Sequence, residues 1–144
     1  MVYEAPLSWL PWWPIDTAGA QAREWVSDPA GAAERFMRRL IGDERWEHLP
    51  PATRDARRAE GPALVGELLD VRTSPPWDAA AVHVPVLSLF GSRSAEHHRR
   101  SAAQIGEWFG VTPIAVDGAK HFGVNTHPDV VGRLVADFAH RVLA

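Results

Sequence analysis

The sequence predicts an α/β fold in which a helical segment precedes alternating strands and helices. Its 144 residues are enough for a domain with a hydrophobic core. Two apolar runs, near residues 84–90 and 113–116, are each followed by a stretch with helical periodicity. This alternation predicts parallel strands joined by right-handed helical crossovers. Residues 16–73 show no strand pattern and predict short helices instead.

Residues 1–15 are rich in aromatic side chains and proline. Val2 and Tyr3 favour a short strand, and the prolines at 6, 11 and 14 prevent a helix after it. The tryptophans here are Trp9, Trp12 and Trp13. Packing between two parts of the protein explains them more simply than an aromatic wall for an apolar substrate, although the two roles are compatible.

The helical segment, residues 16–76, contains several signals for helix ends. Asp28 and Pro29 have the order of an N-cap followed by the first helical position. Gly42 suits the end of that helix. The Pro50–Pro51 pair begins the next helix, and Gly61–Pro62 separates it from a further apolar stripe. We therefore expect short helices that end at residues 73–76.

The last part of the chain, residues 77–144, predicts strand, helix, strand and helix in that order. The apolar run 84–90 is typical of a parallel strand covered on both faces. A helix is expected over 94–109, closed by Gly110. The spacing of Thr126 and Asp129 predicts a capping box for the last helix, with Pro128 in its first turn.

One stretch combines an apolar strand, Asp117–Gly118, then Ala119-Lys120-His121-Phe122-Gly123 and an amphipathic helix. Together with the upstream run Val84–Gly91, it resembles the C-terminal part of an α/β-hydrolase. The resemblance implies a partial α/β-hydrolase fold. Residues 1–15 would hold a core-strand end and an aromatic loop, residues 16–76 a helical lid, and residues 77–144 the last strands with the catalytic histidine loop.

The resemblance also implies site residues. His121 would be the catalytic base and acid, held by a carboxylate from Glu4 or, as the alternative, Glu96. The substrate would be a small apolar ester or a related acyl compound, and no cofactor would be needed. The predicted substrate-binding residues are Trp9, Trp12, Trp13 and Phe122.

A serine nucleophile of the hydrolase type is missing from this sequence. No G-x-S-x-G pentapeptide occurs, and Gly91-Ser92-Arg93-Ser94-Ala95 has its serines in the wrong places. We therefore expect a truncated hydrolase-type chain that is inactive alone and needs an N-terminal half to act on its substrate. Two alternatives remain: a misplaced start, and a non-catalytic protein that associates with itself through an unpaired sheet edge.

Composition limits the classes of partner. A net charge of −3 argues against nucleic acid and anionic membranes, and no apolar stretch approaches the ~20 residues of a membrane span. The absence of cysteine is compatible with the cytoplasm, which is the expected location. His97 and His98 are adjacent on a helix and do not share a face, so no metal site is expected there.

Overall fold

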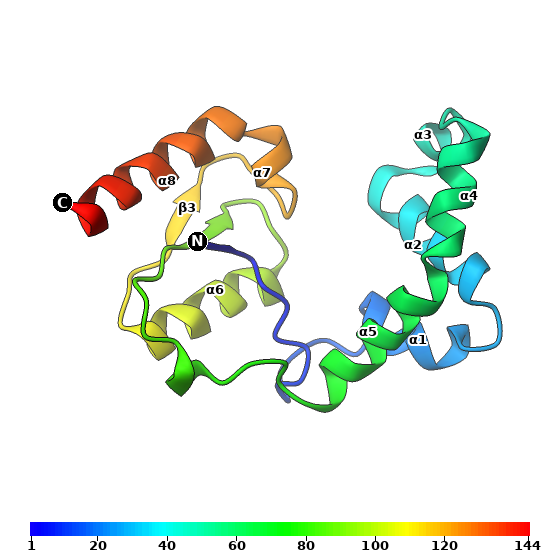
Figure 1. The fold of residues 1–144 in the computed structure, drawn as a ribbon, viewed down its shortest axis with the longest axis horizontal. Helices are drawn as coiled ribbons and strands as arrows, with labels where there is room; N and C mark the ends of the chain where they lie inside the picture. Colours follow the sequence, from blue (N-terminus) through cyan, green and yellow to red (C-terminus); the bar gives the residue numbers. More distant parts are fainter. The chain divides into compact units, whose positions relative to one another are not determined.

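A computed structural model describes the backbone of all 144 residues and every side chain except those of Ala18 and Ala20. The chain divides into a first unit, Met1–Leu7 with Trp77–Ala144, and a second unit, Ser8–Pro76. The elements of the first unit are β1 (Val2–Tyr3), η1 (Ala79–Ala81), β2 (Ser88–Gly91), α6 (Glu96–Phe109), β3 (Ile114–Val116), α7 (Gly123–Thr126) and α8 (Pro128–Leu143). Figure 1 shows both units along the chain.

The first unit is built on a parallel sheet with strand order β1–β2–β3. Val2 and Tyr3 lie opposite Ser88 and Leu89, and residues 89–91 of β2 lie opposite residues 114–116 of β3. The predicted α/β class and parallel strands are therefore confirmed. Because all three strands run the same way, their carboxyl ends meet at one edge of the sheet.

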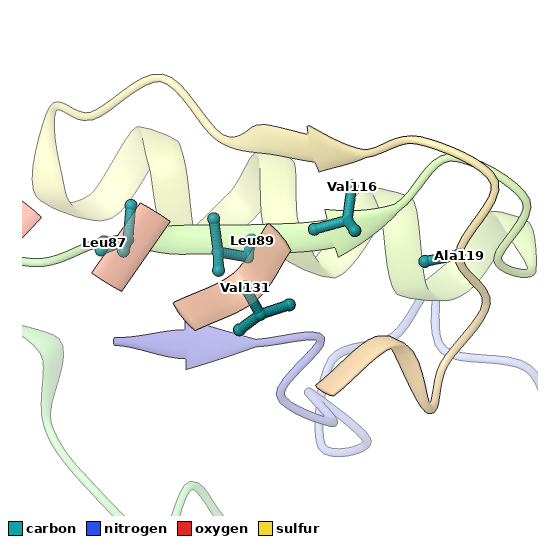
Figure 2. Close-up of a cluster of buried hydrophobic side chains, with 5 residues drawn as sticks. All are labelled: Leu87, Leu89, Val116, Ala119 and Val131. Carbon is teal, nitrogen blue, oxygen red and sulfur yellow. The ribbon is translucent and has the colours of Figure 1, made fainter. Parts of the chain in front are cut away.

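Helices α6 and α8 cover opposite faces of this sheet (Figures 1 and 2). Leu89 is fully buried on the face of α8, where it belongs to a core cluster with Val131. On the other face, the hydroxyl of Ser88 donates to the carbonyl of Ala102 in α6 at 3.3 Å. The other members of the cluster are Leu87, Val116 and Ala119 (Figure 2). This covering of both faces explains why the β2 region reads as a nearly unbroken apolar run.

Two details of the first unit differ from the sequence prediction. The strand expected over 84–90 is shorter, β2, because Val84 is 69% exposed and lies before the sheet begins. Thr126 does not cap the last helix. It ends the short helix α7, and the cap residue of α8 is His127, which makes no side-chain capping bond. The Pro128 position at the start of α8 is as predicted.

The second unit is helical over the segment expected to be so. Its helices are α1 (Ala18–Trp25), α2 (Pro29–Ile41), α3 (Asp43–Glu47), α4 (Pro51–Ala59) and α5 (Gly61–Thr73). The Asp28 carboxylate caps α2 by accepting from the N–H of Gly31 at 3.0 Å, as its sequence position predicts. The buried hydrophobic cluster of the second unit joins α1, α2 and α5 through Trp25, Ala32 and Val65.

Candidate functional site

Polar side chains gather where the three parallel strands end. Glu4 directly follows β1, His98 lies in the first turn of α6 after β2, and His121 lies in the loop after β3. One nitrogen or oxygen atom of each residue lies within 4.8 Å of the others. The common direction of the strands therefore brings Glu4 next to two histidines that follow it by more than ninety positions in the chain.

Glu4 is the buried centre of this cluster. Only 1% of the surface of Glu4 is exposed to solvent. One carboxylate oxygen, Oε1, accepts from the backbone N–H of Gly91 at 2.7 Å. The other, Oε2, lies 2.8 Å from Nδ1 of His121. A buried carboxylate needs such partners, and here both of its oxygens have one.

The Glu4 backbone adopts a φ of 46°, in the left-handed region that residues other than glycine seldom occupy. Such a conformation costs about 1–3 kcal/mol and persists only where the surrounding structure holds it. The N–H of Glu4 donates to the carbonyl of Leu89 at 3.2 Å, which ties this residue to β2. The chain therefore turns sharply after β1 and directs the carboxylate toward His121.

The pKa of Glu4 reflects two opposing effects. Burial raises the pKa of the carboxyl, but nearby donors from Ser94, Gly91 and His121 outweigh burial and hold the pKa below its usual value. The Ser94 hydroxyl is buried close enough to favour the ionised carboxylate, although its geometry falls outside that of a hydrogen bond to any described residue. Glu4 is therefore a carboxylate at neutral pH.

The loop that carries His121 is fixed by bonds to its neighbours. Ser92, just after β2, donates its hydroxyl to Asp117 at 3.1 Å and accepts from the N–H of Gly118 at 2.8 Å. On the other side of the histidine, the hydroxyl of Tyr3 donates to the carbonyl of Lys120 at 2.8 Å. The loop is thereby attached to both neighbouring strands, which limits how far the imidazole can move from Glu4.

Close packing at Gly91 brings the end of β2 against the loop that carries His121. A Cβ atom added there would lie 2.4 Å from the carbonyl oxygen of Ala119. The N–H of Arg93 donates to that same carbonyl at 2.9 Å. Only glycine leaves room for this approach at the end of β2, so the residue that donates to Glu4 also allows the His121 loop to lie against the strand.

His98 lies against His121 in a stacked arrangement. Their ring centroids are 4.1 Å apart and the ring planes differ by 12°. Nδ1 of His98 is 3.8 Å from Oε2 of Glu4. Burial, with smaller effects from the neighbouring His121 and His97, lowers the pKa of His98 to about 4, although the Glu4 carboxylate acts to raise it. His98 is therefore neutral at physiological pH.

The sequence prediction did not assign His98 to this site. The prediction considered His98 only beside its helix neighbour His97, although the two ring centroids lie 4.2 Å apart. The missed signal is its place in the first turn of a helix that follows a parallel strand, which is the same edge of the sheet that carries Glu4 and His121.

The other predicted site residues have different surroundings. Phe122 is 43% exposed, and its ring lies 5.3 Å from that of His121. Glu96, the alternative acid, pairs with Arg99 at 2.7 Å on the exposed start of α6. The tryptophans Trp9, Trp12 and Trp13 belong to the second unit, in which Trp13 is 7% exposed and donates from Nε1 to Thr17. Their role in substrate binding remains a prediction.

Comparison with known proteins gives a partial match to one curated protein. No family model matches this chain, and no solved structure matches it. A curated protein named ferrochelatase, from Aromatoleum aromaticum (strain DSM 19018 / LMG 30748 / EbN1), is 29% identical over 119 residues. The match covers 80% of this chain. The chain spans about 30% of the length of that relative.

This match contradicts the resemblance to α/β-hydrolases. The prediction of a serine-hydrolase-type protein that acts on an ester substrate is therefore wrong. The features behind it are a parallel strand, a histidine loop and a docked helix. Many α/β proteins share them, because parallel sheets place functional side chains at the carboxyl ends of their strands. The alternative of a non-catalytic, self-associating protein gains no support from the match either.

Among the residues that the structure describes, no helix is both long enough and apolar enough to cross a lipid bilayer.

Proposed function

We propose that the chain provides a general acid–base site in which Glu4 and His121 act as a pair. The observation that carries this proposal is the 2.8 Å separation between Oε2 of Glu4 and Nδ1 of His121. A carboxylate that accepts a hydrogen bond from the Nδ1–H group keeps the proton on Nδ1 and leaves the Nε2 lone pair available to a ligand. The same carboxylate stabilises the imidazolium that forms when Nε2 takes a proton.

Glu4 is buried and His121 is partly exposed, and both properties suit an acid–base pair. The Glu4 side chain is 0% exposed, so its charge interacts with the imidazole and is little screened by water. The His121 side chain is 43% exposed, so a molecule arriving from solvent can reach the ring. The bond from Gly91 to Oε1 keeps the carboxylate oriented while the proton moves.

The partner in this proposal is a small molecule that gives or takes a proton at Nε2. The half-exposed ring of Phe122 beside His121 offers an apolar wall for it. An apolar part on the ligand is thus expected next to the atom that exchanges the proton.

Reaction with diethyl pyrocarbonate tests the pair without knowledge of the ligand. The reagent modifies unprotonated imidazole nitrogens, and peptide mass spectrometry gives a rate for each histidine. His140 is an exposed histidine in α8 and serves as the internal control. We expect His121 to react faster than His140, because the Glu4 carboxylate holds the imidazole proton on Nδ1 and leaves the Nε2 lone pair free to react. We expect Glu4→Gln to remove that difference. Equal rates for His121 and His140 in the unchanged protein would reject the pair.

A second candidate function is the activity that the relative's name states, ferrochelatase. It is favoured by the alignment of 80% of this chain with that protein. Ferrochelatase activity in the isolated chain, lost in the Glu4→Gln variant, would support it. An inactive chain would remove this candidate and leave the acid–base pair standing.

A further inference from the structure

We propose that Glu4, His98 and His121 together bind a divalent first-row transition-metal ion, with Zn²⁺ or Fe²⁺ as the fitting ions. The proposal deepens the function proposed above and rests on it in one respect, since two of the three ligands are the acid–base pair. The third ligand, His98, has no part in that pair, and this separates the two proposals experimentally.

The positions of the donor atoms carry the proposal. Oε2 of Glu4 lies 2.8 Å from Nδ1 of His121 and 3.8 Å from Nδ1 of His98. Ligand atoms of a tetrahedral ion at bond lengths of about 2.0–2.2 Å lie about 3.3–3.6 Å apart. The two observed separations fall on either side of that range. Shifts of about half an ångström would therefore bring both to the separation that a bound ion requires.

The chemistry of the donors selects the class of ion. Two imidazole nitrogens and one carboxylate oxygen suit zinc and ferrous iron, whereas calcium and magnesium prefer sites made of oxygen ligands. Three protein ligands also leave at least one coordination position open. The exposed side of His121 gives an ion and a further small ligand a way in from solvent.

One movement is needed before an ion can bind. The rings of His98 and His121 are stacked with planes 12° apart, so the nitrogen lone pairs of the two rings lie in nearly parallel planes and do not point into the space between the rings. An ion between them requires one ring to turn about its outer torsion, which is a broad and soft rotation in histidine. His121 is the ring with room to turn, because 43% of its side chain is exposed, while Glu4 stays fixed by Gly91.

Binding would replace the proton that Glu4 and His121 share. The ion takes the Nδ1 lone pair of His121, and the displaced proton passes to solvent. The metal-bound state therefore lacks the Nδ1 proton on which the acid–base pair depends. An ion in this site would switch the pair off, or would replace its proton chemistry by activation of a ligand at the open position.

The experiment is a titration of the full chain with Co²⁺, followed by visible absorption, with Zn²⁺ as the competitor. We expect the d–d bands of a low-symmetry, four-coordinate cobalt site, and their loss when Zn²⁺ is added. His98→Ala and the closer-sized His98→Gln should each weaken binding by about tenfold or more. His140 is an exposed histidine of the same unit, so His140→Ala is the matched control. This variant should bind Co²⁺ as tightly as the unchanged protein.

Circular dichroism confirms that each variant is folded before it is titrated. Octahedral cobalt spectra in the unchanged protein, or equal binding by both His98 variants and the unchanged protein, would overturn the metal site. Such a result leaves the diethyl pyrocarbonate rates of His121 intact, so failure of the metal site and failure of the acid–base pair are told apart. Weak binding in His140→Ala as well would also overturn it, because the ion would then be held by surface histidines.

Discussion

The unusual backbone of Glu4 leads to a prediction that compares two variants at one position. Glu4→Ala and Glu4→Gly both remove the carboxylate, and so both lose its bonds to Gly91 and His121. They differ in how well they tolerate a φ of 46°. Alanine keeps the steric conflict of a left-handed residue, whereas glycine does not. We therefore expect the glycine variant to be the more stable of the two.

The magnitudes follow from these contacts. Loss of a buried carboxylate that accepts two hydrogen bonds should lower the free energy of unfolding of the first unit by about 3 kcal/mol in the alanine variant. Relief of the left-handed conformation returns about 1–2 kcal/mol in the glycine variant. The greater freedom of glycine in the unfolded chain removes about 0.5–1 kcal/mol of that gain. A net advantage of up to about 1.5 kcal/mol for glycine over alanine remains.

Amide hydrogen exchange is the suitable assay, because it reports each unit separately. The exchange rates of amides in β2 give the free energy of opening of the sheet. Amides in α2 and α5 of the second unit serve as the control and should not change. A glycine variant that is equally stable or less stable than the alanine variant would refute the strain at Glu4. Equal loss of protection in both units would also contradict the prediction, because the effect would then not be confined to the unit that contains Glu4.

Two further predictions concern one residue in each unit. Gly91→Ala should lower the free energy of unfolding of the first unit by about 1–3 kcal/mol, because the new methyl group would lie 2.4 Å from the Ala119 carbonyl oxygen. Chemical denaturation, followed by the fluorescence of the tryptophans in that unit, measures this loss of stability. Glu34 bonds to Arg38 and Arg58, and these bonds hold its pKa below the ordinary value of 4.5. A group with a lowered folded pKa adds stability above its unfolded value and loses it as pH falls. We therefore expect the second unit to weaken below about pH 4.5, and less so in Glu34→Gln, as thermal unfolding across pH would show; equal slopes would contradict this.

Much of the fold follows from local sequence patterns. The order of apolar runs and helical stretches predicted parallel strands correctly, since parallel sheets covered on both faces leave a strong apolar signal. The start of β2 was misplaced because Val84 is as apolar as the strand residues, yet it is 69% exposed. The capping box at Thr126 failed because a separate short helix, α7, uses that threonine at its own end.

The site was harder to predict than the fold. Glu4 and His121 were named from their order along the chain, and the structure places them 2.8 Å apart. His98 was left out of the predicted site. Residue spacing along one helix cannot reveal a contact between side chains that follow three different strands. The hydrolase identification failed for a related reason. A histidine loop after a parallel strand is a property of the sheet edge and not of one family.

The bond between Glu4 and His121 is tested most directly by the side-chain ¹⁵N and ¹H resonances of His121 in metal-free protein at neutral pH. We expect a protonated Nδ1 with a downfield proton, and an unprotonated Nε2. In Glu4→Gln the downfield proton should disappear and the protonated nitrogen should change. The side-chain resonances of His140 should be the same in both proteins. An unprotonated Nδ1 in the unchanged protein, or the same His121 spectrum in both, would contradict the carboxylate–imidazole pair.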